Sequence, residues 1–529
     1  MGTVKLLDCT LRDGGYLVDK SFSESIVHNI VNGLTLAGVD FVELGFLQEN
    51  IEKKENVCFI NSAGARKYIP AERKSTLYTA FADYSRYSAK NLDEFDGLSF
   101  ECVRACFFKE ERKDAIGFLK DIQRKEYKVF MQPVGILRYS NAELIDLLAD
   151  TNEIMPYCFS IVDTFGSMYL EDLRLKLALI HSELSHDIML GFHSHNNKEM
   201  SNALSMEFVQ IMKGERDICV DATLYGMGKG AGNTRTEIVV DYLNKRHGKN
   251  YRLHTLLDVI DSSVSGFSDQ LGWGYDLSMY LAGIHSSHIN NVDYLLGKAG
   301  LRTKDVSWIL GRLTDEERSR YDYARLDELY HQCIKKEHDR DDVEVLRRVM
   351  QGKCVLVVVP GNTVSTHESD ISGFIAKAKP LVVSINFVPS KIEADYVYFN
   401  NPRRYDFFQS SGQLAGKRTI LTSNVDAGDG NSSMVPVERI LSGTDDNSAI
   451  LLLNLLDLLG VSEVALAGFD GFTEHGRNYV YDELVKPSAA PHAKNEKISA
   501  LFSDFLGRTK IGKISFVTPS VFDRPRGAR

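Results

Sequence analysis

The chain has 529 residues, of which 43% are hydrophobic, 25% charged and 10% aromatic, and it carries a formal net charge of −10. This length predicts about three domains of ordinary size, or fewer if one of them is a (β/α)8 barrel of ~250 residues. The 27 Phe and 23 Tyr residues provide apolar surface for packed cores and exclude an intrinsically disordered chain, while the acidic excess argues against a nucleic-acid-binding protein.

The first residues, MGTVKLLDCT, lead directly into a strand-like pattern and lack the basic and apolar regions of a signal peptide. No apolar run in the sequence reaches the ~18 residues that a membrane-spanning helix needs. The eight cysteines are scattered without a CxxC pair. Cys102 and Cys106 could suggest a metal site, but they lie in the apolar run FECVRACFF, which favours buried, reduced thiols. These features predict a cytoplasmic protein without a membrane span.

Residues 1–250 contain eight short apolar runs, separated by amphipathic stretches long enough for helices. Such runs are typical of strands that are buried on both faces of a parallel sheet. Eight alternating strand and helix units close into a TIM barrel, which is the fold predicted for this region. The predicted strands are VKLLDCT (4–10), FVELGF (41–46), LYTAFA (77–82), FECVRACFF (100–108), KVFMQPVG (128–135), YCFSIVDTFG (157–166), DIMLGFHSHN (187–196) and ICVDATLYGMG (218–228).

Residues 251–350 change to helical periodicity and include a densely charged stretch that is typical of solvated helical faces. This region is predicted to be a helical segment that completes the active site and leads into a further domain. In residues 351–529 the strand and helix rhythm resumes, which predicts a separate, doubly wound, Rossmann-like α/β domain. Its predicted strands lie in the apolar runs 354–363, 380–387, 394–401, 418–424 and 461–470. The stretch GDGNSSM (428–434) is expected to be a surface loop.

Polar residues follow predicted strands 1 and 7, at the end where TIM barrels carry their active sites. Strand 7 ends with His193 and His195, and because side chains alternate along a strand, these two imidazoles project to the same side. Asp13 follows strand 1 and adds a carboxylate at the barrel mouth. Two imidazoles, one carboxylate and open coordination positions predict a divalent-metal site.

Three segments, LLDCTLRDGGY, GFHSHNN and GMGKGAGNT, occur in this order on the predicted barrel. Together they resemble the superfamily of pyruvate aldolases and Claisen-condensation enzymes, the DRE-TIM metallolyases. This superfamily includes 4-hydroxy-2-oxovalerate aldolase, isopropylmalate synthase and hydroxymethylglutaryl-CoA lyase. The stretch LAGIHSSHINNVDYLLGKAGLRTKDVSWILGRL (281–313) is similar to the helical segment that follows the barrel in 4-hydroxy-2-oxovalerate aldolases, which are the closest match.

The resemblance implies a site for one divalent cation, Mn²⁺ or Mg²⁺, with Zn²⁺ as an alternative. The implied metal-binding residues are Asp13, His193, His195 and Asn233. A 2-oxo acid chelates such an ion through its carboxylate and keto oxygens, and the ion then acts as a Lewis acid on the developing enolate. Arg12 is implied to add hydrogen bonds and a permanent positive charge at that oxygen. Glu43, at the end of the second predicted strand, matches a family carboxylate and is expected to orient Arg12.

Two departures from the family pattern narrow the expected chemistry. Hydroxymethylglutaryl-CoA lyases carry a catalytic Cys in the glycine-rich loop after strand 8, whereas this chain has Met227 and Lys229 there, so that activity is not expected. In the aldolases a His follows the Arg-Asp-Gly segment and a Tyr comes from the helical region, but here the corresponding residues are Tyr16 and His285. We therefore expect His285, assisted by Tyr16, to be the general base for a 4-hydroxyl proton, with His288 as a weaker candidate.

The expected activity is therefore that of a metal-dependent aldolase, which cleaves or forms a 4-hydroxy-2-oxo acid through a pyruvate enolate. Its expected partners are a small 2-oxo acid and an aldehyde, and the chain is expected to form a homodimer. A Claisen-type synthase that condenses an acyl-CoA with a 2-oxo acid remains open, because the synthase branch also takes a His from a helical segment after its barrel.

In the C-terminal region, Gly361, Asn362 and Thr363 follow an apolar run and precede a predicted helix, an arrangement that can bind phosphate. With the ADYVYFNN and ALAGFDGF segments, this region is faintly similar to the nucleotide-binding domains of bacterial sialyltransferases and 6-hydroxymethylpterin diphosphokinase-like proteins. That similarity implies a nucleotide or nucleotide-sugar ligand and a role in surface-polysaccharide precursor synthesis. A packing or oligomerisation domain with an ordinary tight turn is an equal alternative.

Overall fold

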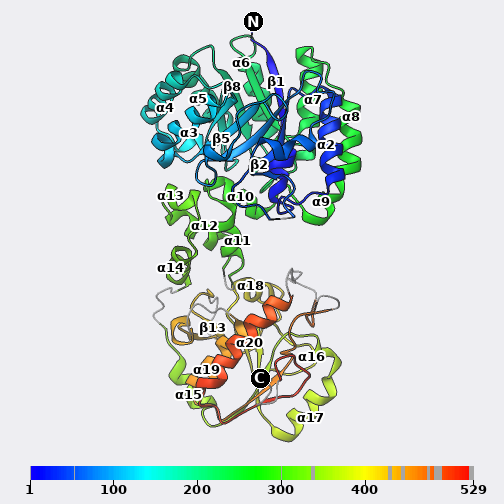
Figure 1. Ribbon diagram of the computed structural model, residues 1–529. Coiled ribbons are helices and arrows are strands. Elements are labelled where there is room, and N and C mark those ends of the chain that lie inside the picture. Colours follow the sequence, from blue (N-terminus) through cyan, green and yellow to red (C-terminus); the bar gives the residue numbers. More distant parts are fainter. Residues whose placement is uncertain are drawn as a thin grey trace. The chain divides into compact units, whose positions relative to one another are not determined.

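The computed structural model describes residues 2–52, 54–298, 301–334, 340–426, 432–441, 447–473, 477–481 and 491–523. The chain divides into two compact units (Figure 1). The first unit is Met1–Val292 with Thr314–Arg320, and the second is Asp293–Leu313 with Tyr321–Arg529. The predicted helical segment 251–350 is therefore shared between the two units.

The first unit is built on a closed, eight-stranded parallel β-barrel in the described part of the chain (Figure 1). Strands follow one another around the barrel, and β1 pairs with β2 to close it, with Leu7 opposite Phe41 and Asp8 opposite Val42. The barrel strands are β1 (Val4–Asp8), β2 (Phe41–Leu47), β4 (Leu77–Asp83), β5 (Cys102–Phe107), β6 (Lys128–Pro133), β7 (Cys158–Asp163), β8 (Met189–Ser194) and β9 (Ile218–Ala222). A two-residue strand, β3 (Cys58–Phe59), pairs with the end of β2. The predicted TIM barrel is confirmed, and each of the eight predicted runs overlaps one barrel strand.

Helices cover the outside of this barrel, although not after every strand. The helices of this layer are α2 (Glu24–Ala37), α3 (Arg112–Arg124), α4 (Asn141–Ile154), α5 (Leu170–Glu183), α6 (Ser201–Met212), α7 (Thr236–His247) and α8 (Leu253–Val259). Between β2 and β4, and between β4 and β5, the described chain has no α-helix, and its only helical turns are the 3₁₀ segments η2 (Ser62–Tyr68) and η3 (Ala89–Asn91). Local sequence explains the ends of α2: the Ser23 side chain accepts a hydrogen bond from the Ile26 amide, and Gly38 ends the helix at a φ of 83°.

The inside of the barrel below the mouth is apolar and closely packed. Its buried residues are Leu7, Cys9, Phe41, Cys102, Phe130, Cys158, Met189 and Cys219. All eight cysteines are free, and six of them are buried. The barrel interior is thus a filled core, which leaves the carboxyl ends of the strands as the place for a polar site.

The region 251–350 is helical, as predicted. After α8 come η7 (Ile260–Val264), a π-helical turn, and the helices α9 (Ser265–Leu271), α10 (Leu277–Ile284), α11 (Ile289–Leu296), α12 (Thr303–Arg312), α13 (Asp315–Ser319), α14 (Tyr323–Ile334) and α15 (Val343–Met350). The helix α10 begins at Asp276, whose side chain accepts hydrogen bonds from the amides of Ser278 and Met279.

The second unit contains a parallel sheet, which has seven strands in the described residues and the order β14-β13-β12-β11-β10-β15-β16. The strands are β10 (Cys354–Val358), β11 (Leu381–Ile385), β12 (Tyr396–Phe399), β13 (Thr419–Thr422), β14 (Ser432–Val435), β15 (Glu463–Ala467) and β16 (Lys513–Phe516). The helices that follow β10 in the described residues are α16 (Thr363–Thr366), α17 (Glu368–Ala378), α18 (Pro402–Ser410), α19 (Ser448–Leu458) and α20 (Pro491–Arg508). Strand order reverses between β10 and β15, as in doubly wound folds.

The predicted α/β domain is therefore confirmed, with two strands that the sequence did not indicate. Ser432–Val435 form the edge strand β14. The prediction of a surface loop over 428–434 is therefore wrong for residues 432–434, and residues 428–431 lie outside the described residues. β16 forms the other edge, and its KISF sequence is too short to show a period. Among the described residues, no helix is long and apolar enough to cross a membrane.

Candidate metal centre

The site is built on the short helix α1 (Thr10–Asp13), which follows β1 at the barrel mouth. Buried hydrogen bonds hold the start of this helix. Asp8 accepts from the Thr10 amide at 2.9 Å and from the Thr236 hydroxyl at 2.6 Å. The Thr10 hydroxyl in turn accepts from the Leu224 amide at 2.7 Å. These contacts join β1 to the chain that follows β9 and thereby place Asp13 inside the mouth.

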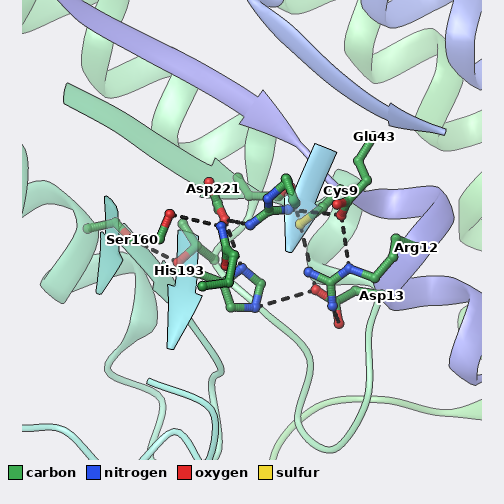
Figure 2. A network of polar contacts seen from close by, with 12 residues as sticks. Cys9, Arg12, Asp13, Glu43, Ser160, His193 and Asp221 are labelled. Carbon is green, nitrogen blue, oxygen red and sulfur yellow. Dashed lines mark hydrogen bonds and ion pairs between the residues drawn. The ribbon is translucent and has the colours of Figure 1, made fainter. Parts of the chain in front are cut away.

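Asp13 and His193 lie close together, although α1 and β8 are far apart in the sequence. The Asp13 Oδ2 atom is 3.5 Å from His193 Nε2, and Figure 2 shows this imidazole between the carboxylates of Asp13 and Asp221. The ring of His195 lies edge-on to that of His193, at 5.1 Å between centroids. Cys9 completes the cluster, because ligand atoms of Cys9, Asp13 and His193 all lie within 4.8 Å of one another.

The buried atoms of this cluster fit a divalent cation. Within the described residues, both ring nitrogens of His193 and both polar atoms of the Asn233 amide are buried without a hydrogen bond of good geometry. Unsatisfied buried polar atoms are costly and rare in folded proteins, and a bound cation would satisfy one ring nitrogen of His193 and the side-chain oxygen of Asn233. His193 and His195 are the residues that would coordinate through nitrogen, and Asp13 the one that would coordinate through oxygen.

The protonation states are those that metal coordination requires. Burial, together with the charge of Arg12, lowers the pKa of both His193 and His195, so both imidazoles are neutral. Burial alone would raise the pKa of Asp13, but the neighbouring positive charges, above all Arg12, hold it below its usual value. Metal ligands must be deprotonated, so these residues are prepared for an ion without a proton being displaced.

A buried network of arginines and carboxylates surrounds the cluster (Figure 2). Arg12 donates to Asp13 Oδ1 at 2.7 Å and to Glu43 Oε2 at 2.9 Å. The same Glu43 oxygen accepts from Arg104 on β5 at 2.9 Å, and Arg104 also forms an ion pair with Asp221 on β9. Desolvation raises the pKa of Glu43 and that of Asp221, the latter to about 6. The carboxylates of Asp13 and Glu43 thus hold the Arg12 guanidinium in a fixed direction, toward the cluster.

Three residues of this network did not emerge from the sequence. Arg104 and Asp221 stand in the apolar runs FECVRACFF and ICVDATLYGMG, and a charged residue inside a strand buried on both faces is the signal that could have revealed them. Arg104 is fully buried, and Asp221 Oδ2 is 3.2 Å from His193 Nδ1. Cys9 carries no local signal, because a single thiol in an apolar run is usually a core residue.

The glycine-rich loop after β9 brings Asn233 next to His195. His195 and Asn233 form an isolated antiparallel bridge. Gly232 has a φ of 82°, and a Cβ on it would lie 2.0 Å from the Gly226 carbonyl oxygen. A Cβ on Gly228 would lie 2.2 Å from the Asn233 amide nitrogen and 3.4 Å from the Asp13 Cβ. The glycines are therefore needed for the close approach of this loop to Asp13 and Asn233.

The residues expected to act as the base or to assist it, Tyr16, His285 and His288, lie in two groups. Lys229 Nζ is 2.9 Å from His288 Nε2 and 5.7 Å from the centroid of the Tyr16 ring, so these three residues come together. His285 follows the last turn of α10, and its carbonyl accepts a hydrogen bond from Arg318 at 3.4 Å. Burial lowers the pKa of His285, and it lowers that of His288 further, to about 3.

The barrel region is similar to known proteins. A family model described as HMGL-like matches residues 3–262, which span the barrel. Residues 3–262 are therefore similar to the HMGL-like family.

Proteins similar to the barrel region include enzymes with different names. The oxaloacetate decarboxylase of Mycobacterium tuberculosis (strain ATCC 25618 / H37Rv) is 26% identical over 315 residues, which cover 57% of this chain and 89% of that protein. The 4-hydroxy-2-oxovalerate aldolase of Thermomicrobium roseum (strain ATCC 27502 / DSM 5159 / P-2) is 25% identical over 332 residues, covering 58% and 86% of the two chains. Among solved structures, hydroxymethylglutaryl-CoA lyase from Pseudomonas aeruginosa has a TM-score of 0.42 at 18% identity and covers 51% of this chain and 95% of that chain.

The second unit does not present Gly361, Asn362 and Thr363 as an open phosphate cradle. The Thr363 amide donates to Asp470 Oδ2 at 2.8 Å, and the Thr363 hydroxyl also donates to the Asp470 carboxylate. The Gly361 amide is hydrogen-bonded to the carbonyl oxygens of Val359 and Gly468. The helix that follows, α16, has only four residues. In this conformation the Asp470 carboxylate occupies the place that a phosphate oxygen would take.

A cavity of about 220 Å³ lies beside this turn, at the carboxyl ends of β10, β11 and β15. This is the switch point of the sheet, where doubly wound folds bind their ligands. Arg404 lines the cavity and lies over the Tyr481 ring at 4.7 Å and the Tyr479 ring at 5.8 Å. Asn386, also in the lining, has a φ of 57° and donates to Asn400 and Ser448.

Proposed function

We propose that this protein is a divalent-metal-dependent aldolase that cleaves or forms a 4-hydroxy-2-oxo acid through a pyruvate enolate. The observation that carries the proposal is the buried cluster of Asp13 and His193, with Arg12 directed at the same point by Glu43. The family of the barrel and its aldolase relative support the class of reaction.

In the proposed cleavage, a base removes the 4-hydroxyl proton, the bond between C3 and C4 breaks, and its electron pair becomes the enolate of pyruvate. The former C4 leaves as an aldehyde, and the enolate takes a proton at C3 to give pyruvate. A cation bound by Asp13, His193 and His195 would supply Lewis-acid stabilisation of the enolate oxygen. Arg12 stabilises the same oxygen by hydrogen bonds, which are strong in a site from which water is excluded.

The base is proposed to be His285, because burial and the charge of Arg318 lower the pKa of its imidazole and keep it neutral near pH 7. The variant His285→Ala should lose cleavage and retain exchange of the pyruvate methyl protons with D2O, since that exchange needs only the enolate site. His288→Ala is the matched control and should retain cleavage. Loss of cleavage in His288→Ala alone would move the role of base to His288.

The activity is tested by the release of pyruvate from 4-hydroxy-2-oxo acids of several chain lengths, coupled to lactate dehydrogenase. Turnover should require Mn²⁺ or Mg²⁺ and disappear with a chelator. No turnover at any chain length, with metal bound, would contradict the proposal. Oxaloacetate belongs in the same assay, because faster pyruvate release from it would favour decarboxylation, and thiol release from acetyl-CoA with a 2-oxo acid would favour the Claisen alternative.

For the second unit, we propose that the cavity at the switch point binds a nucleotide or nucleotide-sugar, which would connect the aldolase with surface-polysaccharide precursors. Arg404 over two tyrosine rings supports this, because such a group can bind phosphate while the rings contact a base or sugar. Nucleotides should raise the unfolding temperature of the full chain, and Arg404→Gln should abolish the shift. Lys353→Gln, an exposed residue before β10, is the control. No shift with any nucleotide would contradict this proposal.

A further inference from the structure

Six buried side chains at the barrel mouth form a closed ring of polar contacts, in which carboxylates alternate with nitrogen-bearing groups (Figure 2). The ring closes at Asp13, because its Oδ1 atom accepts from Arg12 at 2.7 Å and its Oδ2 atom is 3.5 Å from His193 Nε2. The member farthest from Asp13 along the ring is Arg104, which is fully buried. In order, the members are Asp13, Arg12, Glu43, Arg104, Asp221 and His193.

Arg104 connects to the rest of the ring through two separate carboxylates. On one side, Glu43 Oε2 accepts from Arg104 and from Arg12, each at 2.9 Å. On the other side, the Asp221 oxygen that pairs with Arg104 also lies 3.2 Å from His193 Nδ1. A shift of this one guanidinium would therefore change the surroundings of Arg12 and of His193 together.

A neutral pair of side chains on the next strands fixes the plane of the Arg104 guanidinium. The side-chain oxygen of Gln132 on β6 accepts from Nε and Nη2 of Arg104, both at 3.1 Å, and from the Ser160 hydroxyl on β7 at 2.8 Å. Gln132 and Ser160 are both buried. All three nitrogens of Arg104 therefore have an acceptor, which a planar guanidinium can provide and a single ammonium group cannot.

Arg104 also compensates buried charge, and this role must be separated from its effect on direction. The ring holds three carboxylates and two guanidinium groups, so Arg104 supplies half of its guanidinium charge. Loss of that charge would leave carboxylates buried without compensation and would destabilise the fold. Arg104→Lys keeps the charge and removes the planar group, whereas Gln132→Met keeps Arg104 and removes its neutral acceptor.

We infer that Arg104 is a positioning residue, which sets both the direction of the Arg12 guanidinium and the placement of the His193 imidazole. Gln132 assists by fixing the plane of the Arg104 guanidinium. This inference rests on the proposed function, in which Arg12 stabilises the enolate oxygen and His193 holds the metal. It deepens that function by naming the buried residue on which both depend.

The test measures metal affinity and catalysis separately in the full chain. A competition titration with a metal-sensitive dye gives the Kd for Mn²⁺, and pyruvate release from a 4-hydroxy-2-oxo acid at saturating Mn²⁺ gives kcat and KM. In Arg104→Lys the affinity for Mn²⁺ should fall about 10- to 100-fold, as it does when a group that orients a ligating imidazole is removed. With the metal site saturated, kcat should still fall about tenfold or more with little change in KM, because Arg12 loses its direction.

Gln132→Met should lower the Mn²⁺ affinity and kcat by a smaller factor, about two- to tenfold each, because it removes hydrogen bonds and no charge. The control is Leu148→Ala, which destabilises the first unit from the buried face of α4 and should leave the Mn²⁺ affinity unchanged. Circular dichroism measures folding in all variants. If Arg104→Lys does not fold, Gln132→Met decides the test.

Unchanged Mn²⁺ affinity and kcat in the folded variants would overturn the inference, and so would a loss of only one of the two, since Arg104 would then not serve both residues. An equal loss of affinity in Leu148→Ala would also overturn it, because reduced stability would then be the cause. A wild-type protein that binds Mn²⁺ without cleaving any 4-hydroxy-2-oxo acid would refute the proposed function alone. Exchange of the pyruvate methyl protons with D2O would then replace cleavage as the measure of Arg12.

Discussion

At the scale of single residues, the site depends on charges that are buried in mutual contact. Arg12, Arg104, Asp13, Glu43 and Asp221 are each at most 5% exposed, so each depends on its neighbours for compensation. Removal of one member leaves an unpaired buried charge, which typically costs about 3–5 kcal/mol of stability. Each substitution that tests function in this network therefore needs a second, conservative substitution at the same residue and a direct measurement of folding.

Arg12 and His193 should separate catalysis from metal binding. Arg12→Ala is expected to reduce turnover by about 10²–10³-fold while the protein keeps its metal, because the loss is that of an oxyanion stabiliser. His193→Ala is expected to lose the metal as well, because a ligand is gone. Turnover and metal content by elemental analysis measure both, with Arg12→Lys as the conservative control. Unchanged metal content in His193→Ala would show that the coordination assignment is wrong.

Asp221 should act on the metal through His193, because its Oδ2 atom lies 3.2 Å from His193 Nδ1. Asp221→Asn is expected to weaken metal binding by about 10- to 100-fold, the usual effect of removing a carboxylate that orients a ligating imidazole. A competition titration with a metal-sensitive dye measures the change. Asp217→Asn, a substitution on the loop before β9, is the control, since in the described residues the Asp217 side chain accepts its hydrogen bonds from Thr3. Equal affinities of the two variants would contradict the role of Asp221.

At the scale of elements, the positions of the strands were predictable, whereas their exact ends and the loop conformations were not. The run 218–228 was expected to be one strand, but β9 ends at Ala222 and the 3₁₀ turn η6 (Leu224–Gly226) follows. Tyr225 in this turn has a φ of 56°, which apolar periodicity cannot indicate. Asn233 reaches His195 because of this turn and the glycines after it.

The glycine-rich loop gives a prediction with an internal control. Gly232→Ala should destabilise the protein by about 1–3 kcal/mol and weaken metal binding, because the new Cβ would be 2.0 Å from the Gly226 oxygen at a φ of 82°. Gly248→Ala also has a positive φ, 64°, but nothing lies within 4 Å of its Cβ. It should cost only about 1 kcal/mol and leave metal binding intact. Denaturant unfolding and metal titration measure both, and equal effects of the two variants would contradict the steric argument.

At the scale of the whole molecule, the two units predict a selective effect of metal on unfolding. The residues proposed to hold Mn²⁺ all lie in the first unit, so Mn²⁺ should raise the unfolding temperature of that unit and leave the transition of the second unchanged. At a concentration 100 times Kd, the stabilisation is about 2.7 kcal/mol. Calorimetry with and without Mn²⁺ measures the shifts, and His193→Ala should abolish them. A shift confined to the second unit would contradict the site.

The sequence by itself determined the barrel, the helical region and the second α/β sheet, because apolar periodicity records which faces are buried. It also placed Asp13, His193 and His195 at one barrel mouth, since the carboxyl ends of parallel strands meet there. Only the tertiary structure decided that Arg104 contacts Glu43, 61 residues away, and Asp221, 117 residues away. It alone showed that Asp470 binds the Thr363 amide across 107 residues. Periodicity sets the direction of a side chain, whereas its partners depend on how distant segments pack.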